Sequence, residues 1–345
     1  MRKITIITGA SSGMGAEFAR QIANNTESSE IWLFARNKEK LESVRNGILG
    51  IEQENGKRKT ENGKLETESE SETLETETEP QNETEPETQE EVADSETANE
   101  NQETGNEKRK TESGKWKVEN GKQESESYAI HDFPQIKVVP MNLSGKEGVT
   151  LFKTFLATEK ISGGFEIDML VNNAGFGTYG EFATTPLEKE LEMIDLNCTA
   201  LTGLCGAVLP YMHKGSSIIN VASLAAFLPL GNFAVYAATK AYVLSFSVAL
   251  AAELKDKGIK VSALCPGSVS TDFANVASNG ARKEVLNGKD PVMVVAHCLK
   301  KAKRGKKIIL WAKKWKFTAF MSRFIGRYLG ARYTFKYNKR PSEWR

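Results

Sequence analysis

The chain has 345 residues, and its 46 Lys and Arg residues against 45 Asp and Glu residues give a net charge of +1, as in an ordinary soluble protein. The charges are segregated, however: residues 52–127 hold 24 acidic and 10 basic residues, and residues 300–345 hold 16 basic residues and one acidic residue. The large apolar side chains lie mostly outside the acidic segment, and they suffice for one sizeable α/β domain rather than several.

The first predicted element is a strand followed by a glycine-rich turn. Residues 4–8 form an apolar run that is shorter than the roughly 7–15 residues of a signal-peptide core, so we expect a buried strand there. The stretch from Thr8 to Gly15 reads TGASSGMG and opens a helix predicted over residues 13–24. Glycines at such a turn let the backbone approach a pyrophosphate, which amide groups and the positive helix end stabilise. Phosphate contacts are therefore expected from Gly9, Ser11, Ser12, Gly13, Met14 and Gly15.

A second strand is predicted over residues 31–35, and Arg36 follows it directly. Enzymes that use NAD carry a ribose-binding carboxylate at this place. A guanidinium cannot accept the proton of the ribose 2′-hydroxyl, but it matches a 2′-phosphate bidentately. The sequence therefore favours NADP(H) over NAD(H) as the cofactor.

A low-complexity segment follows the helix predicted over residues 38–48. Residues 52–127 consist almost entirely of Glu, Thr, Ser, Asn, Lys and Gly, with very few large apolar side chains. Burial of so few groups cannot offset the backbone entropy of folding, about 1–2 kcal/mol per residue. We predict a disordered insert in a helix-to-strand connection, away from the catalytic edge of the sheet. The alternative is an acidic tract that binds a partner or folds back on the basic C-terminus.

Strands and helices alternate again after the insert. Predicted helices cover residues 146–160, 187–212, 236–257 and 291–303, and predicted strands cover residues 136–141, 168–172, 217–221, 260–265 and 308–311. Seven strands separated by helices indicate an α/β fold: a doubly wound, Rossmann-like parallel sheet in a single catalytic domain of residues 1–51 and 128–312. No run approaches the roughly 18 consecutive apolar residues of a membrane-spanning helix, so none is predicted.

Further motifs follow these strands in a fixed order. Asn172-Asn173-Ala174-Gly175 closes the fourth strand, Ser223 follows the fifth, Tyr236 and Lys240 share a helix, and Pro266-Gly267 and Thr271 follow the sixth. With the glycine-rich turn, this pattern resembles the compact form of the short-chain dehydrogenase/reductase family. The resemblance covers the core but neither the insert nor most of the C-terminal tail. It implies an NAD(P)-dependent oxidoreductase whose catalytic residues are Asn197, Ser223, Tyr236 and Lys240.

The spacing of Tyr236 and Lys240 supports a catalytic pair independently of the resemblance, because residues four apart lie on one face of a helix. A free tyrosine has a pKa of about 10, and a neighbouring ammonium is expected to lower that pKa. Tyr236 would then protonate the alkoxide that forms when hydride reaches a carbonyl carbon. The resemblance implies that Ser223 orients the oxygen, that Lys240 binds the nicotinamide ribose, and that Asn197 holds a water molecule.

The resemblance extends to the cofactor contacts. It implies contacts from Asn173, Ala174, Gly175, Tyr236, Lys240, Pro266, Gly267 and Thr271. Asn142 departs from the pattern, since the family commonly carries Asp there to bond the adenine amino group. An amide oxygen can still accept that hydrogen bond, but it carries no charge, so we expect weaker adenine binding.

The expected substrate pocket is walled by loops with mostly apolar residues. They are Phe176, Tyr179, Phe182, residues 224–230 and Phe273. Such walls favour an apolar ketone or alcohol, a 3-oxoacyl thioester included, although the same side chains could simply pack the loops together. The alternative function is a non-catalytic nucleotide-binding scaffold that recruits partners through its charged insert and tail.

Metal binding is not predicted. The four cysteines are scattered singly, and His131, His213 and His297 lack partner ligands in the sequence. Because the cysteines are not paired, a reducing cytoplasm is the expected setting. A homo-oligomer is expected, because the family often assembles through the helices before and after Ser223.

Residues 313–345 are predicted to form a basic amphipathic C-terminal helix and tail. Phe317, Phe320, Phe324 and Tyr328 share one stripe at helical spacing, flanked by Lys and Arg. The stripe could cover the substrate pocket or a subunit contact, or it could lie peripherally on an anionic membrane. The first interpretation is preferred, with the three phenylalanines over the pocket. Nucleic acid is not an expected partner, since no RNA-binding motif accompanies the basic residues.

Overall fold

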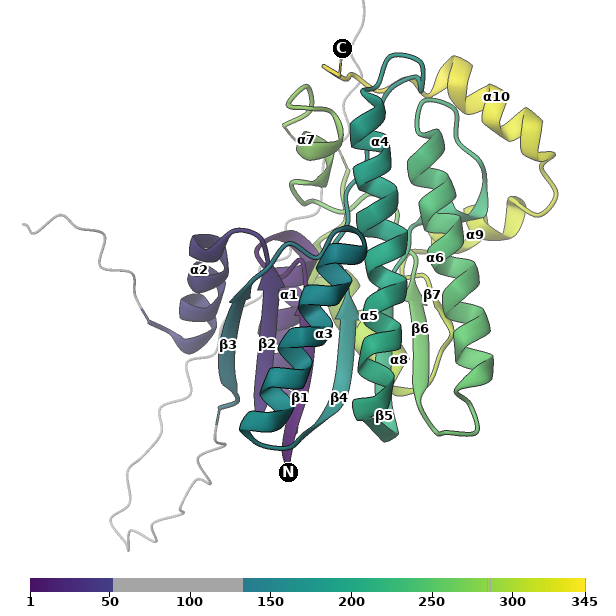
Figure 1. The fold of residues 1–345 in the computed structure, drawn as a ribbon. Helices are drawn as coiled ribbons and strands as arrows, with labels where there is room; N and C mark the ends of the chain where they lie inside the picture. Colours follow the sequence, from purple (N-terminus) through teal and green to yellow (C-terminus); the bar gives the residue numbers. More distant parts are fainter. Residues whose placement is uncertain (52–132, 284, 286, 345) are drawn as a thin grey trace, which may run out of the picture. The chain divides into compact units, whose positions relative to one another are not determined.

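The computed structural model describes residues 1–51, 133–283, 285 and 287–344, and the chain divides into two units, Met1–Asn55 with His131–Arg345 and Gly56–Ile130. The first unit contains a parallel sheet in the order β3-β2-β1-β4-β5-β6-β7 (Figure 1). Its strands are β1 (Arg2–Thr8), β2 (Glu30–Ala35), β3 (Gln135–Pro140), β4 (Phe165–Asn172), β5 (Met212–Val221), β6 (Lys260–Leu264) and β7 (Ile308–Ile309). The predicted fold class is confirmed. The predicted disorder of residues 52–127 lies outside the described residues.

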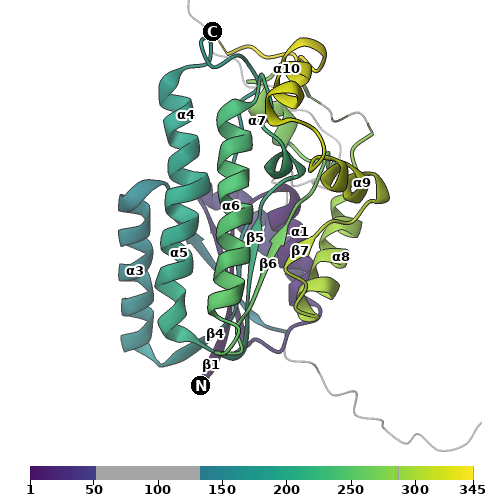
Figure 2. The ribbon, with the colours of Figure 1, turned by 90° about the vertical axis from the view of Figure 1, so that its right-hand side faces the viewer.

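Helices cover both faces of this sheet (Figure 2). On one face lie α3 (Gly145–Ser162), α4 (Leu187–Ile194), α5 (Leu201–Val208) and α6 (Ala234–Glu253). On the other face lie α1 (Gly13–Ala23), α2 (Lys38–Leu49) and α8 (Pro291–Lys303). Burial on both faces explains why the strands are apolar runs rather than alternating patterns.

Alternate residues of each strand enter different cores. Ile4 and Ile6 of β1 join the core beneath α3, α5 and α6, whereas Ile7 joins the core beneath α1, α2 and α8. In β2, Trp32 and Phe34 face the first core and Leu33 faces the second. Successive side chains of each strand therefore point to opposite faces of the sheet, as expected for a β-strand.

The long helix predicted over residues 187–212 is interrupted. It comprises α4, a π-helical turn η1 (Asp195–Ala200), α5 and a 3-10 turn η2 (Leu209–Tyr211), and Met212 already belongs to β5. The π turn adds a residue within a helix that hydrophobic periodicity reads as continuous. The prediction was wrong in this detail because a one-residue bulge hardly alters the apolar pattern.

Two helical stretches, Leu187–Tyr211 and Ala234–Glu253, are long and apolar enough to cross a membrane, judged by length and composition alone. Neither stretch is an uninterrupted apolar run, because small and polar residues interrupt both, and for that reason neither was predicted as a membrane span. Leu204 and Leu250 of these stretches are buried against the sheet, as expected of core helices in this fold.

The C-terminal region crosses the end of the sheet at which the strands finish (Figures 1 and 2). It contains α9 (Lys313–Met321) and α10 (Arg327–Tyr337), with the short α7 (Phe273–Ala277) nearby. The single C-terminal helix predicted within residues 313–345 is thus two helices, so the prediction was wrong in its continuity. The break ends at Gly326, a residue type with poor helix propensity, which stands as the N-cap of α10.

Candidate active site

A cleft of about 1960 Å³ opens at the carboxyl ends of the strands. Its lining extends from the glycine-rich turn after β1 to the C-terminal segment. The cleft brings together every predicted catalytic and cofactor-binding residue except Gly15 and Asn197. This is the edge at which ligands bind in doubly wound sheets.

The glycine-rich turn has the backbone geometry that a phosphate site requires. Gly9 and Gly13 adopt φ angles of +62° and +53°, in the left-handed region that favours glycine. A Cβ on Gly15 would overlap the carbonyl oxygen of Gly9, so Gly15 allows close packing beneath the turn rather than lining the cleft. Ser12 precedes α1 without capping it through its side chain, which leaves the first amide groups of the helix available to an anion.

The Asn172–Gly175 motif fastens this turn to the end of β4. The Thr8 hydroxyl accepts hydrogen bonds from the amides of Asn173 and Ala174, each at 3.0 Å. The Asn173 side-chain amide donates to the carbonyl oxygens of Thr8 and Gly9 at 3.2 and 3.1 Å. The motif therefore fixes the position of the turn as well as lining the cleft.

Arg36, Lys40 and Asn142 line the opposite end of the cleft from the C-terminal segment. Arg36 directly follows β2 and is exposed to solvent. The side-chain oxygen of Asn142 accepts a hydrogen bond from the amide of Ser144 at 3.3 Å, just before α3 begins. Part of its hydrogen-bonding capacity is therefore already used within the protein.

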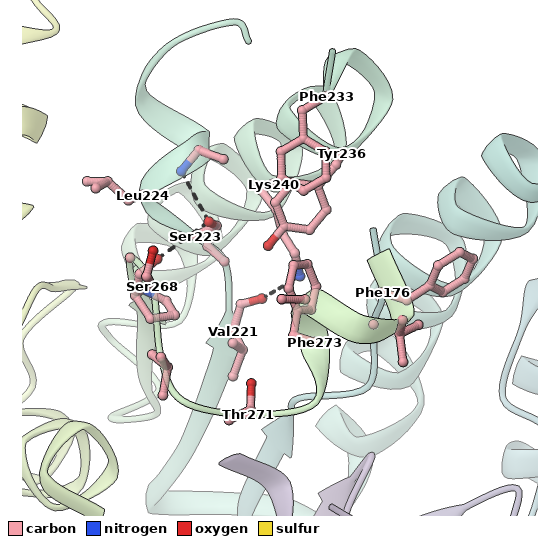
Figure 3. A pocket seen from close by; sticks show the side chains of 18 of the residues that line it. Phe176, Val221, Ser223, Leu224, Phe233, Tyr236, Lys240, Ser268, Thr271 and Phe273 are labelled. Atoms are coloured by element: carbon pink, nitrogen blue, oxygen red, sulfur yellow. Dashed lines mark hydrogen bonds between the residues drawn. The ribbon is translucent and has the colours of Figure 1, made fainter. Parts of the chain in front are cut away.

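Ser223, Tyr236 and Lys240 converge in the middle of the cleft (Figure 3). The hydroxyl groups of Ser223 and Tyr236 point towards a shared space, and the Lys240 ammonium lies 5.7 Å from the centre of the Tyr236 ring. Lys240 Nζ donates to the carbonyl oxygen of Val221 at 2.9 Å. Ser223 Oγ accepts from the amide of Ala225 at 3.1 Å, which fixes the serine side chain. The geometry thus places a phenol, an alcohol and an ammonium around one point.

Burial dominates the protonation of this group. Desolvation raises the pKa of Tyr236 well above its ordinary value of 10, and the Ser223 hydroxyl and the Arg340 guanidinium only partly oppose that rise. Desolvation likewise lowers the pKa of Lys240 to about 8. The predicted lowering of the Tyr236 pKa was therefore wrong for the protein without ligand. A phenolate here loses its hydration, while Lys240 is itself desolvated and bonded to Val221.

Asn197 lies outside the cleft, within the π turn between α4 and α5. Its side-chain oxygen accepts from the amide of Phe176 at 3.2 Å, and its amide donates to the Phe176 carbonyl at 2.9 Å and to Thr239 Oγ1 at 3.1 Å. These bonds tie the loop after β4 to α6. The water molecule assigned to Asn197 by resemblance remains a prediction.

Aromatic rings surround Tyr236. Phe233 stacks on it with ring centroids 4.1 Å apart, Phe273 lies at 5.4 Å, and Tyr179 packs on Phe233 at 4.6 Å. Most of the predicted wall lines the cleft, namely Phe176, Tyr179, Phe273, Leu224, Ala225, Phe227, Leu228 and Leu230. Phe182 does not: its side chain is 57% exposed on the surface, so its prediction as a wall residue was wrong.

The C-terminal segment supplies cleft residues that sequence analysis missed. Arg340 places its guanidinium carbon 4.7 Å from the centre of the Tyr179 ring, and Arg282 approaches the same ring at 5.6 Å. The Trp344 indole donates to the carbonyl of Ala277 at 2.9 Å, which fastens the chain end beside α7. No local motif marks Arg340 or Trp344, and only the basic composition of the tail indicated Arg340. Arg282 precedes α8 and lies outside the tail.

Trp315 and the inner side of α9 also line the cleft, whereas Phe317, Phe320 and Phe324 are exposed and do not. The tail therefore does cover the pocket, but with other residues than predicted. Within the described ranges, His, Cys, Asp and Glu side chains do not gather in groups of three or more that could hold a metal ion. His131 lies outside those ranges.

The fold and the cleft define a doubly wound α/β protein with a ligand site at the carboxyl edge of its sheet. The sequence profile of the family described as short chain dehydrogenase matches residues 123–281. Over 144 residues the chain is 33% identical to the probable oxidoreductase EphD of Mycobacterium tuberculosis, covering 41% of this chain and 23% of that protein. Over 133 residues it is 35% identical to serine 3-dehydrogenase of Rhizobium radiobacter, covering 37% and 53%. The chain thus spans a little less than a quarter of the first relative's length and about half of the second's.

Two solved structures share the fold. A short-chain dehydrogenase from Sphingobium yanoikuyae in complex with NADPH has a TM-score of 0.59 at 20% identity, covering 94% of both chains. A short-chain dehydrogenase/reductase from Burkholderia phymatum in complex with NAD has a TM-score of 0.60 at 16% identity, covering 99% of this chain and 97% of that one. These two structures show the fold alone. Over residues 123–281, a little under half of the chain, the sequence is similar to the short-chain dehydrogenase family.

Proposed function

We propose that the protein is an NADP(H)-dependent oxidoreductase that interconverts an apolar ketone and its alcohol. The observation that carries this proposal is the convergence of Ser223, Tyr236 and Lys240 in the same cleft as the glycine-rich turn. Left-handed glycines, available helix amides and the Asn173 anchor suit the turn to a dinucleotide pyrophosphate.

A bound nicotinamide supplies or accepts the hydride. In the reducing direction, the Tyr236 hydroxyl donates its proton to the substrate oxygen, and the Ser223 hydroxyl holds that oxygen by a hydrogen bond. The raised pKa of Tyr236 keeps the phenol protonated and ready to donate. Lys240, held by the Val221 carbonyl, places positive charge beside the ring and so stabilises the phenolate left after proton transfer.

Arg36 supports the preference for NADP(H). It lines the cleft at the end of β2 together with Lys40, and two cations at this place favour a 2′-phosphate over a hydroxyl. Arg36→Asp should shift the ratio of kcat/KM values from NADPH towards NADH, since a carboxylate repels the phosphate and accepts from the hydroxyl. Lys38→Asp, at an exposed position that does not line the cleft, is the control. An unchanged ratio in Arg36→Asp would contradict the assignment.

The walls around Tyr236 support an apolar substrate, because Phe233, Phe273 and Leu230 present hydrocarbon to the space beside the phenol. Ketones with long alkyl or aryl substituents and 3-oxoacyl thioesters form the panel to be tested with NADPH, by following its absorbance. Turnover of an apolar ketone is expected. Tight NADPH binding without turnover of any compound would instead favour a nucleotide-binding scaffold.

A further inference from the structure

The outer side of α9 and α10 exposes an unusual density of large apolar side chains. We call this surface the α9–α10 face and define it by Phe317, Phe320, Phe324, Ile325, Tyr328, Leu329, Tyr333 and Tyr337. Phe317 is 64% exposed, Phe324 70% and Tyr328 78%. The ring centroids of Phe320 and Phe324 lie 5.3 Å apart and those of Tyr333 and Tyr337 lie 5.1 Å apart. Folded proteins rarely leave so many large apolar side chains to water unless they bind a partner.

The same face is strongly cationic. Residues 313–340 contain nine Lys and Arg residues and no Asp or Glu, and of these cations Lys313, Lys314 and Arg340 line the cleft while the others do not. Exposed cations alternate with the apolar residues along both helices, among them Lys316, Arg323, Arg327 and Arg332. In the described part of the chain, Lys339 is the cation of this segment that pairs with a carboxylate, Glu181, at 3.4 Å. The positive charge is therefore available to an anionic partner.

The inner side of the two helices belongs to the cleft. Trp315, Thr318, Gly330 and Thr334 line it from this side. Ile325, Leu329 and Tyr333 belong to both surfaces, because they line the cleft and are also exposed. The apolar rim of the cleft is therefore continuous with the α9–α10 face.

We propose that the α9–α10 face docks on an anionic phospholipid membrane, so that apolar substrates enter the cleft from the bilayer. Aromatic and aliphatic side chains insert among the acyl chains while the flanking cations contact phosphate headgroups. A second copy of the chain is a poorer occupant, because a two-fold contact would place like charges opposite one another. Nucleic acid offers phosphates but no apolar phase for so many exposed rings.

The test measures sedimentation of the full-length protein with vesicles of phosphatidylcholine alone and of phosphatidylcholine mixed with phosphatidylglycerol. Binding to the anionic vesicles only is expected, and it should weaken as the Debye length shrinks from about 10 Å at 0.1 M salt to about 3 Å at 1 M. Binding to neither kind of vesicle, or equal binding to both, would overturn the proposal. So would salt-sensitive binding to an oligonucleotide, or a concentration-dependent dimer, in the absence of vesicle binding.

Matched variants separate this face from the rest of the surface. Arg323→Gln with Arg327→Gln removes two of its cations, and each lost cation should weaken vesicle binding about fivefold. Lys146→Gln with Lys153→Gln makes the same change in net charge at exposed positions on α3 and should have no effect. Equal weakening in both pairs would mean that net charge alone, rather than this face, attracts the membrane.

The apolar contribution is tested in the same way. Phe317→Ser with Phe324→Ser alters exposed residues that do not line the cleft, and binding should fall by at least about tenfold. Ile161→Ser on α3, at a position 87% exposed, is the control. Unchanged vesicle binding by the double variant would overturn the proposal that the apolar side chains of the α9–α10 face insert into the membrane. These readouts do not require turnover, so their failure is distinguishable from a failure of the proposed oxidoreductase activity.

Discussion

At the residue scale, the protonation of the side chains in the candidate active site depends on their burial as much as on their residue type. The spacing of Tyr236 and Lys240 correctly predicted that they share a helix face. It could not predict that both polar groups lose solvent, because Phe273 and Val221, which contact them, come from distant parts of the chain. Sequence alone therefore brought together the groups that we propose to react, but it reversed the direction of the pKa change at Tyr236.

Tyr236→Phe should lower the turnover rate by about 10²–10⁴, the scale expected when a general acid is removed. NADPH affinity should stay within a few fold, because the ring and its stacking on Phe233 remain. Steady-state kinetics and NADPH fluorescence titration measure the two quantities. Tyr242→Phe, at an exposed site on the same helix, is the control. A near-normal turnover rate in Tyr236→Phe would contradict the assignment of Tyr236 as the proton donor.

Lys240 should give the reaction a pH dependence. Its pKa is lowered from the ordinary value of 10.5 to about 8, so the ammonium loses its proton as the pH rises through 8. If the charged form supports proton transfer from Tyr236, kcat/KM for reduction should be highest below pH 8 and fall above it. Lys240→Arg, which stays charged throughout this range, should lose that decline even if its rate is lower. A wild-type profile that stays flat through pH 8 would contradict the role of Lys240.

At the scale of elements, most helices and strands were predicted within a few residues. Pro291–Lys303 was predicted with both ends correct, since Asp290 caps it through a hydrogen bond to the amide of Val292 and Pro291 follows. The prediction failed where an element depends on remote packing. The π turn around Asn197 is one example, and the break between α9 and α10 is the other.

Ending the chain at Gly326 should open the substrate end of the cleft while leaving the core intact. The deletion removes α10, whose only buried residue is Gly330, together with Arg340 and Trp344. We expect KM for an apolar ketone to rise about tenfold or more, since lost apolar pocket contacts are worth about 1–3 kcal/mol. NADPH affinity should be unchanged. A normal KM in the truncated protein would show that α10 does not shape the substrate site.

At the scale of the whole molecule, the described residues that flank the acidic insert lie at the opposite edge of the sheet from the candidate active site. The chain leaves α2 at Leu49 and resumes before β3 at Gln135, at the amino edge of the sheet, whereas the cleft lies at the carboxyl edge. Topology alone gave this separation, because every strand of a parallel sheet starts at the same edge. The sequence did predict that the C-terminal tail covers the pocket, but it could not predict that Trp315, Arg340 and Trp344, rather than the three phenylalanines, line the cleft.

Deleting Gln53–Glu126 should therefore leave folding and catalysis nearly unchanged. The deleted segment holds very few core-forming residues, and the two elements that it connects, α2 and β3, already pack together. Closure entropy grows only logarithmically with loop length, so a shorter connection should be neutral or slightly stabilising. Thermal unfolding followed by circular dichroism, and kcat/KM with NADPH, measure the outcome. Replacing the segment with a Gly/Ser linker of the same length controls for loop length. Loss of cooperative unfolding in both variants would mean that the insert contributes to the fold; loss in the deletion alone would mean that the shortened connection is strained.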